Sequence, residues 1–160
     1  MEDFIQIKEE NVLKIGVKDK DGKDTGLVIT FDLQDIDFPL RFNKMDGLHK
    51  KNLSVLKQQG AAIDKQEDKK GKFLLSWKTE KKIELLKEHY QREKMALDLL
   101  IGEGMTQKIL DAIDRKPYYN MFDDIVEALL PVLNKIDSEA TKLINSVEKK
   151  YGVNIDEVTI

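Results

Sequence analysis

Apolar and polar residues alternate along the first part of the chain. In residues 12–18 every second side chain is apolar, and residues 26–34 repeat this alternation. A period of two places alternate side chains on one face of a β-strand. Between the two runs lies the pair Asp21-Gly22, which favours a tight turn between antiparallel strands. The pattern therefore predicts a β-hairpin.

The predicted hairpin needs a partner surface. An isolated two-stranded sheet is only marginally stable in water, so its apolar face must pack on helices or on another chain. Phe4, Ile5 and Ile7 offer a candidate third strand. Whether the sheet is completed within one chain or between two chains stays open at this stage.

After Pro39 the apolar residues recur at intervals of three and four, which predicts helices. Gly47 and Gly60 interrupt the first helical pattern, and the polar residues 64–72 predict a loop. Pro131 lies inside the last helical pattern and predicts a kink or a break there. The further helices are predicted over residues 79–101, 106–114 and 120–152.

These elements predict an α+β fold, with an N-terminal β-hairpin or small antiparallel sheet packed on a helical bundle of three to five helices. We expect a hairpin region (1–38), a helical region (39–152) and a C-terminal tail (153–160) that together form one domain. A chain of 160 residues is long enough to bury a core without disulfides. It contains no cysteine, which excludes disulfide and thiolate chemistry.

The charges are unevenly distributed. Residues 41–94 contain 15 Lys and Arg against 8 Asp and Glu, whereas residues 1–40 and 95–160 each carry a net charge of −5. A basic middle between acidic ends attracts an anionic partner, or the acidic ends of a second copy.

The basic segment could in principle bind nucleic acid. Lysines in residues 65–82 surround Phe73 and Trp77, and aromatic rings among lysines can stack on bases. However, acidic residues intervene and the sequence pI is 5.5. The pattern favours a solvated loop in which Phe73, Leu74, Leu75 and Trp77 anchor the following helix into the core, and nucleic acid is not an expected partner.

No catalytic or metal-binding pattern is present in the sequence. The Asp-rich residues 19–24 lack the spacing of a calcium loop. His49 and His89 lie in different predicted helices without ligand spacing, so we expect them at the surface or boundary. Residues 102–104 (Gly-Glu-Gly) lack the strand and lysine of a phosphate-binding loop. The sequence predicts a protein that is not an enzyme and has no catalytic residues, cofactor or metal.

The sequence also lacks membrane signals. The N-terminus is acidic and has no basic region followed by an apolar run, unlike a signal peptide. No apolar stretch approaches the roughly 20 residues that span a bilayer. We expect a cytoplasmic protein without a membrane partner.

Two stretches together resemble a known group of proteins. Residues 27–42 run from a strand through a proline into a helix. Residues 99–109 (Leu-Leu-Ile-Gly-Glu-Gly-Met-Thr-Gln-Lys-Ile) are followed by residues 118–122 (Tyr-Tyr-Asn-Met-Phe) and the helix that runs to residue 136. This pairing resembles small proteins encoded among the tail genes of phages that infect Gram-positive bacteria. The chain is similar in size and layout to siphophage tail-assembly chaperones.

The resemblance implies a non-enzymatic protein-binding factor in phage tail assembly, either chaperone-like or structural. Such a chaperone holds tail-tube subunits or the tape-measure protein in solution until they polymerise, and it self-associates. The implied location is the host cell cytoplasm or the virion. An alternative is a small phage-encoded binding module that inhibits a host protein or binds nucleic acid through residues 41–94.

Five residues are candidates for protein binding, and four of them are aromatic: Met105, Tyr118, Tyr119, Phe122 and Trp77. Aromatic side chains in a loop between helices are typical interface anchors. The same side chains can instead fill the core, and the sequence leaves both interpretations open.

Overall fold

The computed structural model describes residues 3–5, 11–70 and 75–155. In this part of the chain two antiparallel strands precede four helices, which confirms the α+β prediction of a hairpin followed by helices. The elements are β1 (Val12–Lys18), β2 (Asp24–Asp32), α1 (Phe38–Asp64), α2 (Trp77–Ile101), α3 (Met105–Ala112) and α4 (Met121–Tyr151).

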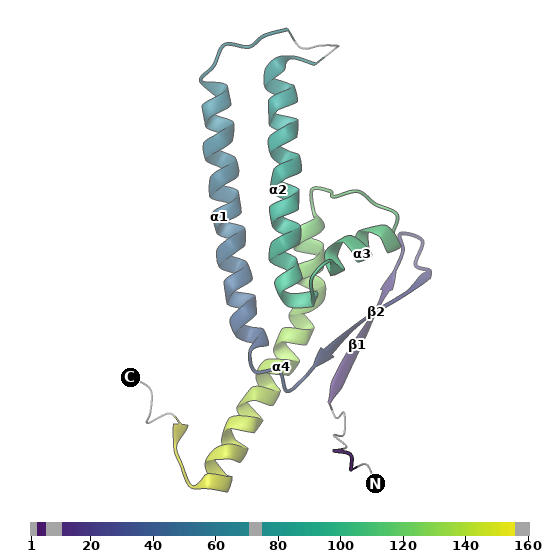
Figure 1. Cartoon of the computed structure of the whole chain (residues 1–160), viewed down its shortest axis with the longest axis vertical. Helices are drawn as coiled ribbons and strands as arrows, with labels where there is room; N and C mark the ends of the chain where they lie inside the picture. The colour runs from purple at the N-terminus through teal and green to yellow at the C-terminus, as the bar shows by residue number, and fades with distance from the viewer. Residues whose placement is uncertain (1–2, 6–10, 71–74, 156–160) are drawn as a thin grey trace.

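Two long helices dominate the shape of the molecule. Helices α1 and α2 run antiparallel, side by side, and project together from the rest of the chain (Figure 1). Helix α4 crosses near their base, and its C-terminal half extends away from the rest of the chain in the direction opposite to the projecting ends of α1 and α2. The sheet and α3 lie next to the C-terminal end of α2. None of the described helices combines the length and the apolar character that crossing a membrane requires.

The β-hairpin shows the predicted alternation. Leu13 lies opposite Phe31 and Ile15 opposite Ile29 in the antiparallel register. Ile29 and Phe31 are buried, whereas the intervening Thr30 is exposed. The apolar face of the hairpin therefore packs on the helices of the same chain.

A third strand is not found where the sequence offered one. Phe4 and Ile5 are 83% and 93% exposed and belong to no strand. Ile7, the remaining member of that candidate strand, lies outside the described residues.

Helices α1 and α4 continue through the residues that the sequence marks as interruptions. Gly47 and Gly60 both lie inside α1, because an internal glycine costs only about 1 kcal/mol relative to alanine, which packing can offset. Pro131 lies inside the continuous helix α4, so of the predicted kink or break, the break does not occur. Proline removes the N–H that would bond to the carbonyl of Glu127. Both residues are exposed, so water can solvate that carbonyl.

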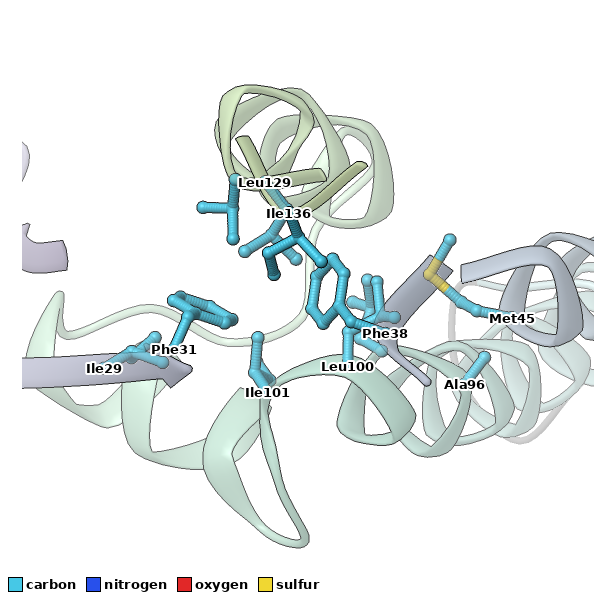
Figure 2. Packing of buried hydrophobic residues seen from close by; sticks show 11 residues of the cluster. Ile29, Phe31, Phe38, Met45, Ala96, Leu100, Ile101, Leu129 and Ile136 are labelled. Carbon is cyan, nitrogen blue, oxygen red and sulfur yellow. The ribbon is translucent and has the colours of Figure 1, made fainter. Parts of the chain in front are cut away.

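The hydrophobic core lies where the hairpin, the start of α1, the end of α2 and the middle of α4 meet (Figure 2). Phe38 is 1% exposed, and its ring meets that of Phe31 edge-on with centroids 5.7 Å apart. Such an edge-to-face pair adds to the free energy of burying both rings. The buried members of the core are Ile29, Phe31, Phe38, Met45, Ala96, Leu97, Leu100, Ile101, Leu129, Val132 and Ile136.

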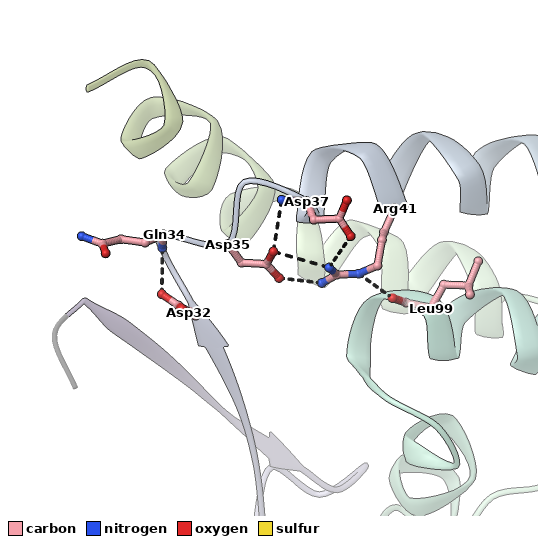
Figure 3. A network of polar contacts seen from close by, with 6 residues as sticks. All are labelled: Asp32, Gln34, Asp35, Asp37, Arg41 and Leu99. Carbon is pink, nitrogen blue, oxygen red and sulfur yellow. Dashed lines mark hydrogen bonds and ion pairs between the residues drawn. The ribbon is translucent and has the colours of Figure 1, made fainter. Parts of the chain in front are cut away.

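Arg41 joins three segments beside this core (Figure 3). Its guanidinium lies 2.8 Å from an oxygen of Asp35 and 3.1 Å from one of Asp37, and its Nε donates a 3.0 Å hydrogen bond to the carbonyl of Leu99. The hydrogen bond from Arg41 holds the pKa of Asp35 below its usual value. One side chain therefore fixes the β2–α1 connection against the end of α2.

The Gly-Glu-Gly corner between α2 and α3 is fixed by a carboxylate. Asp98 accepts hydrogen bonds from the backbone N–H groups of Gly104 and Thr106, both at 2.9 Å, and from the Thr106 hydroxyl at 2.6 Å. Gly104 has a φ of 75°, a left-handed conformation that favours glycine. The carboxylate of Asp98 therefore caps the N-terminus of α3 and holds the corner in place.

Candidate functional site

A pocket of about 270 Å³ lies between α1, α2 and the start of α4. Its apolar lining includes Leu53, Leu56 and Leu86. Its most deeply buried polar residue is Glu93, and the lining residue Tyr119 is 89% exposed. The pocket therefore combines apolar walls, an acidic interior and an aromatic side chain at its mouth.

The polar interior of the pocket consists of one carboxylate and two imidazoles. Glu93 of α2 is 2% exposed. The Nδ1 atom of His49, on α1, lies 2.9 Å and 3.0 Å from the two carboxylate oxygens. The Nε2 atom of His89, one turn before Glu93, lies 3.5 Å from one of them. These contacts join α1 to α2 inside the pocket.

The ring of His49 is also held from its other side. It stacks on the ring of Phe122 with centroids 3.8 Å apart and planes 7° from parallel. Phe122 is the second residue of α4, so His49 contacts both the α2 carboxylate and the start of α4. The three long helices therefore meet at a single imidazole.

Burial changes the titration of His89. The residue is 7% exposed, which corrects the expectation of a surface or boundary position. Its pKa lies below the usual 6.5, mainly because burial disfavours the imidazolium, although the negative charge of Glu93 partly opposes this. Nearby His49 and Arg92 lower the pKa further. His89 is therefore a group that resists protonation in the folded chain.

We expect the free energy of unfolding to fall as the pH falls from about 7.5 to 5.5. Because the folded-state pKa of His89 is lowered, the unfolded chain binds the proton more readily below pH 6.5. Substituting His89→Gln should make this pH dependence less steep. Urea unfolding at several pH values measures the slope for both proteins. An unchanged slope in the variant would assign the acid sensitivity to another group.

Tyr118 and Tyr119 differ in their environment. The hydroxyl of Tyr118 donates a 3.0 Å hydrogen bond to Asp124, and the guanidinium of Arg115 lies 3.7 Å from the centre of its ring. Burial, together with the bond to Asp124, raises the pKa of Tyr118 above 10.0. Tyr119 is 89% exposed. Tyr118 is thus held in place, whereas Tyr119 presents its ring to the solvent.

The five predicted binding residues do not form one site. Tyr118, Tyr119 and Phe122 line the pocket together. Met105 is half-buried and packs against the hydrophobic core. Trp77 begins α2 at the far end of the α1–α2 pair, where the ammonium of Lys69 lies 5.3 Å from its ring centre. Neither Trp77 nor Leu75 packs in or against the core, so the expectation that they anchor the helix there is wrong. Phe73 and Leu74, the other predicted anchors, lie outside the described residues.

His49, His89 and Glu93 were not predicted as members of the site. His49 and Glu93 are 44 positions apart, and neither belongs to a recognisable motif. One available signal was that a helical turn separates His89 from Glu93, which places them on one face. Within residues 3–5, 11–70 and 75–155, no group of three or more His, Asp or Glu side chains is arranged to hold a metal ion.

Comparison with known proteins adds no relative to these observations. No protein-family model, curated protein or solved structure matches the chain.

Proposed function

We propose that this chain is a non-enzymatic protein-binding factor that acts in phage tail assembly and associates with itself. The pocket beside Tyr119 is the single observation that supports protein binding. The resemblance of residues 27–42 and 99–136 to tail-gene proteins supports the assignment to tail assembly.

The size and lining of the pocket suit a side chain of a partner protein. Pockets that enclose drug-sized ligands usually occupy about 300–1,000 Å³. The volume of about 270 Å³ lies close to the lower end of this range, a size that also accepts one or two protruding side chains. Tyrosine is enriched among residues that dominate binding energy, because its ring is large and loses little conformational entropy on binding. Tyr119 is the exposed tyrosine at this pocket.

The proposed partners are tail-tube subunits or the tape-measure protein, and the proposed location is the host cell cytoplasm. These apply to a chaperone-like role. A structural role in the tail would instead place the chain in the virion. The alternative is a small phage-encoded binding module that inhibits a host protein or binds nucleic acid through residues 41–94, and nucleic-acid binding receives less support. At the tip of the α1–α2 pair, the carboxylate of Asp64 already pairs with Lys82, and its backbone carbonyl accepts a hydrogen bond from Lys78.

Co-purification of the full chain with tail-tube and tape-measure proteins tests this function. We expect Tyr119→Ala to weaken capture at least about tenfold, as loss of a central aromatic contact does. Its free energy of unfolding should stay close to that of the native chain, because the side chain is 89% exposed. Titration of tagged chain against each purified partner measures the affinity.

Met95→Ala serves as the matched control. Met95 is 72% exposed on α2 and does not line the pocket, so its truncation should leave capture unchanged. Capture that Tyr119→Ala does not weaken would remove the pocket from the proposal. Failure to capture either tail protein would reject the assignment to tail assembly.

A further inference from the structure

One apolar stripe runs along nearly the whole length of α4. In the first half of the helix Leu129, Val132 and Ile136 lie in this stripe and are buried in the core. The spacing of three and four residues continues past Ile136, so the next apolar residues lie on the same side of the helix. They are Ala140, Leu143, Ile144, Val147 and Tyr151.

The second half of the stripe is not covered by the core. We call residues 137–151 of α4 the distal arm. Ile144, Val147 and Tyr151 are 41%, 40% and 65% exposed, and no residue after Ile136 in α4 is buried. The distal arm extends away from the other helices and the sheet (Figure 1). A helix normally acquires such a stripe because something packs against it.

The charges of the distal arm fit a second copy of the same arm. It contains three acidic residues (Asp137, Glu139, Glu148) and three lysines (Lys142, Lys149, Lys150), so two arms do not repel each other by net charge. Because the net charge of the distal arm is zero, it does not attract an acidic or a basic partner by net charge.

The positions of Glu139 and Lys150 specify the orientation. They are 11 residues apart, which is about three helical turns, so both lie along the same edge of the stripe. When two identical helices pair antiparallel about a two-fold axis, equivalent edges face each other. Glu139 lies 3.3 Å from Lys142 of its own chain, an exposed contact of the kind that contributes little to stability. In the paired arms Glu139 of one copy also lies opposite Lys150 of the other, twice over. The same register places Ile144 beside the axis, in the middle of the exposed apolar stripe.

We infer that the distal arm of α4 is a homodimer interface in which two copies pair antiparallel through Ile144 and the Glu139–Lys150 pairs. This inference deepens the self-association in the proposed function and gives it a surface separate from the pocket. An arm of 15 residues is only about 22 Å long. The contact is smaller than a standard stable interface, so the dimer forms reversibly and depends on concentration.

Sedimentation equilibrium of the full chain over a wide concentration range tests the interface. We expect the native chain to pass from monomer to dimer, and Ile144→Asp to weaken the dimer at least about tenfold, because a charge is buried at the axis. Leu130→Asp is the matched control. Leu130 is 42% exposed on the same helix but lies outside the stripe and the distal arm, so this variant should dimerise like the native chain.

Charge reversal tests the antiparallel register. Glu139→Lys and Lys150→Glu should each weaken the dimer, because each places like charges opposite one another. The double variant should recover most of the native affinity. A double variant no tighter than the two single variants would overturn the register.

The outcomes separate this inference from the proposed function. A monomer at every concentration overturns the interface, yet capture of tail proteins through the pocket could still succeed. A dimer that Ile144→Asp does not weaken also overturns it, while self-association through another surface stands. If capture fails but dimerisation follows the expected pattern, the interface stands and the assignment to tail assembly falls.

Discussion

His49→Ala should lower the free energy of unfolding by about 3 kcal/mol. The substitution removes the side chain whose Nδ1 atom lies within 3.0 Å of both oxygens of Glu93, a carboxylate that is only 2% exposed. A buried carboxylate that loses its nearest hydrogen-bond partner retains the cost of leaving water. The loss of stacking on Phe122 adds to the effect. Urea unfolding followed by circular dichroism measures the change.

A double-mutant cycle shows whether the carboxylate is the cause. Adding Glu93→Gln to His49→Ala should recover part of the lost stability, because the amide carries no charge to leave stranded. Lys51→Ala, an exposed substitution on the same helix, should change stability by less than about 0.5 kcal/mol. If His49→Ala costs no more than this control, the contact with Glu93 contributes little to stability.

Phe38→Ala should lower the free energy of unfolding by about 3–5 kcal/mol. The ring is 1% exposed and packs edge-on against Phe31 of the sheet, so its loss leaves a cavity between the hairpin and the helices. The guanidinium of Arg41, 5.6 Å from the ring centre, also loses its aromatic neighbour. Urea unfolding of the variant measures the loss directly.

Leu40→Ala provides the comparison for Phe38→Ala. Leu40 lies two residues later in the same helical turn but is 65% exposed, so its truncation should cost less than about 0.5 kcal/mol. Similar losses for the two variants would contradict the position of Phe38 at the centre of the core.

The elements of the fold could be predicted because each has a local signal. Alternation in residues 12–18 coincides with β1 (Val12–Lys18), since a period of two cannot satisfy a helix. The breaks suggested at Gly47, Gly60 and Pro131 do not occur. Backbone preferences of about 1 kcal/mol for glycine are smaller than the packing of a long helix, and the missing bond at Pro131 lies on an exposed face.

The candidate site was predictable only in part. Tyr118, Tyr119 and Phe122 are close in sequence, so any fold keeps them near one another. The contact between His49 and Glu93 depends on how α1 and α2 are aligned along their lengths. The two residues are 44 positions apart, and no sequence pattern specifies that alignment. Trp77 does not reach the core, although its sequence context predicts this, because α2 is about 37 Å long and only its C-terminal part contacts the core.

The α1–α2 pair and the distal arm of α4 project from the rest of the molecule, and this shape affects its sedimentation and its size-exclusion elution. Helix α1 has 27 residues and α4 has 31, which correspond to lengths of about 40 and 46 Å. A compact chain of 160 residues has a radius of gyration of about 15 Å, which corresponds to a sphere about 39 Å across, so α4 alone is longer than that diameter. We therefore expect the monomer to have a raised frictional ratio and to elute early for its mass. Elution volume alone would assign it to an oligomer, so only a shape-independent mass distinguishes a single chain from a pair.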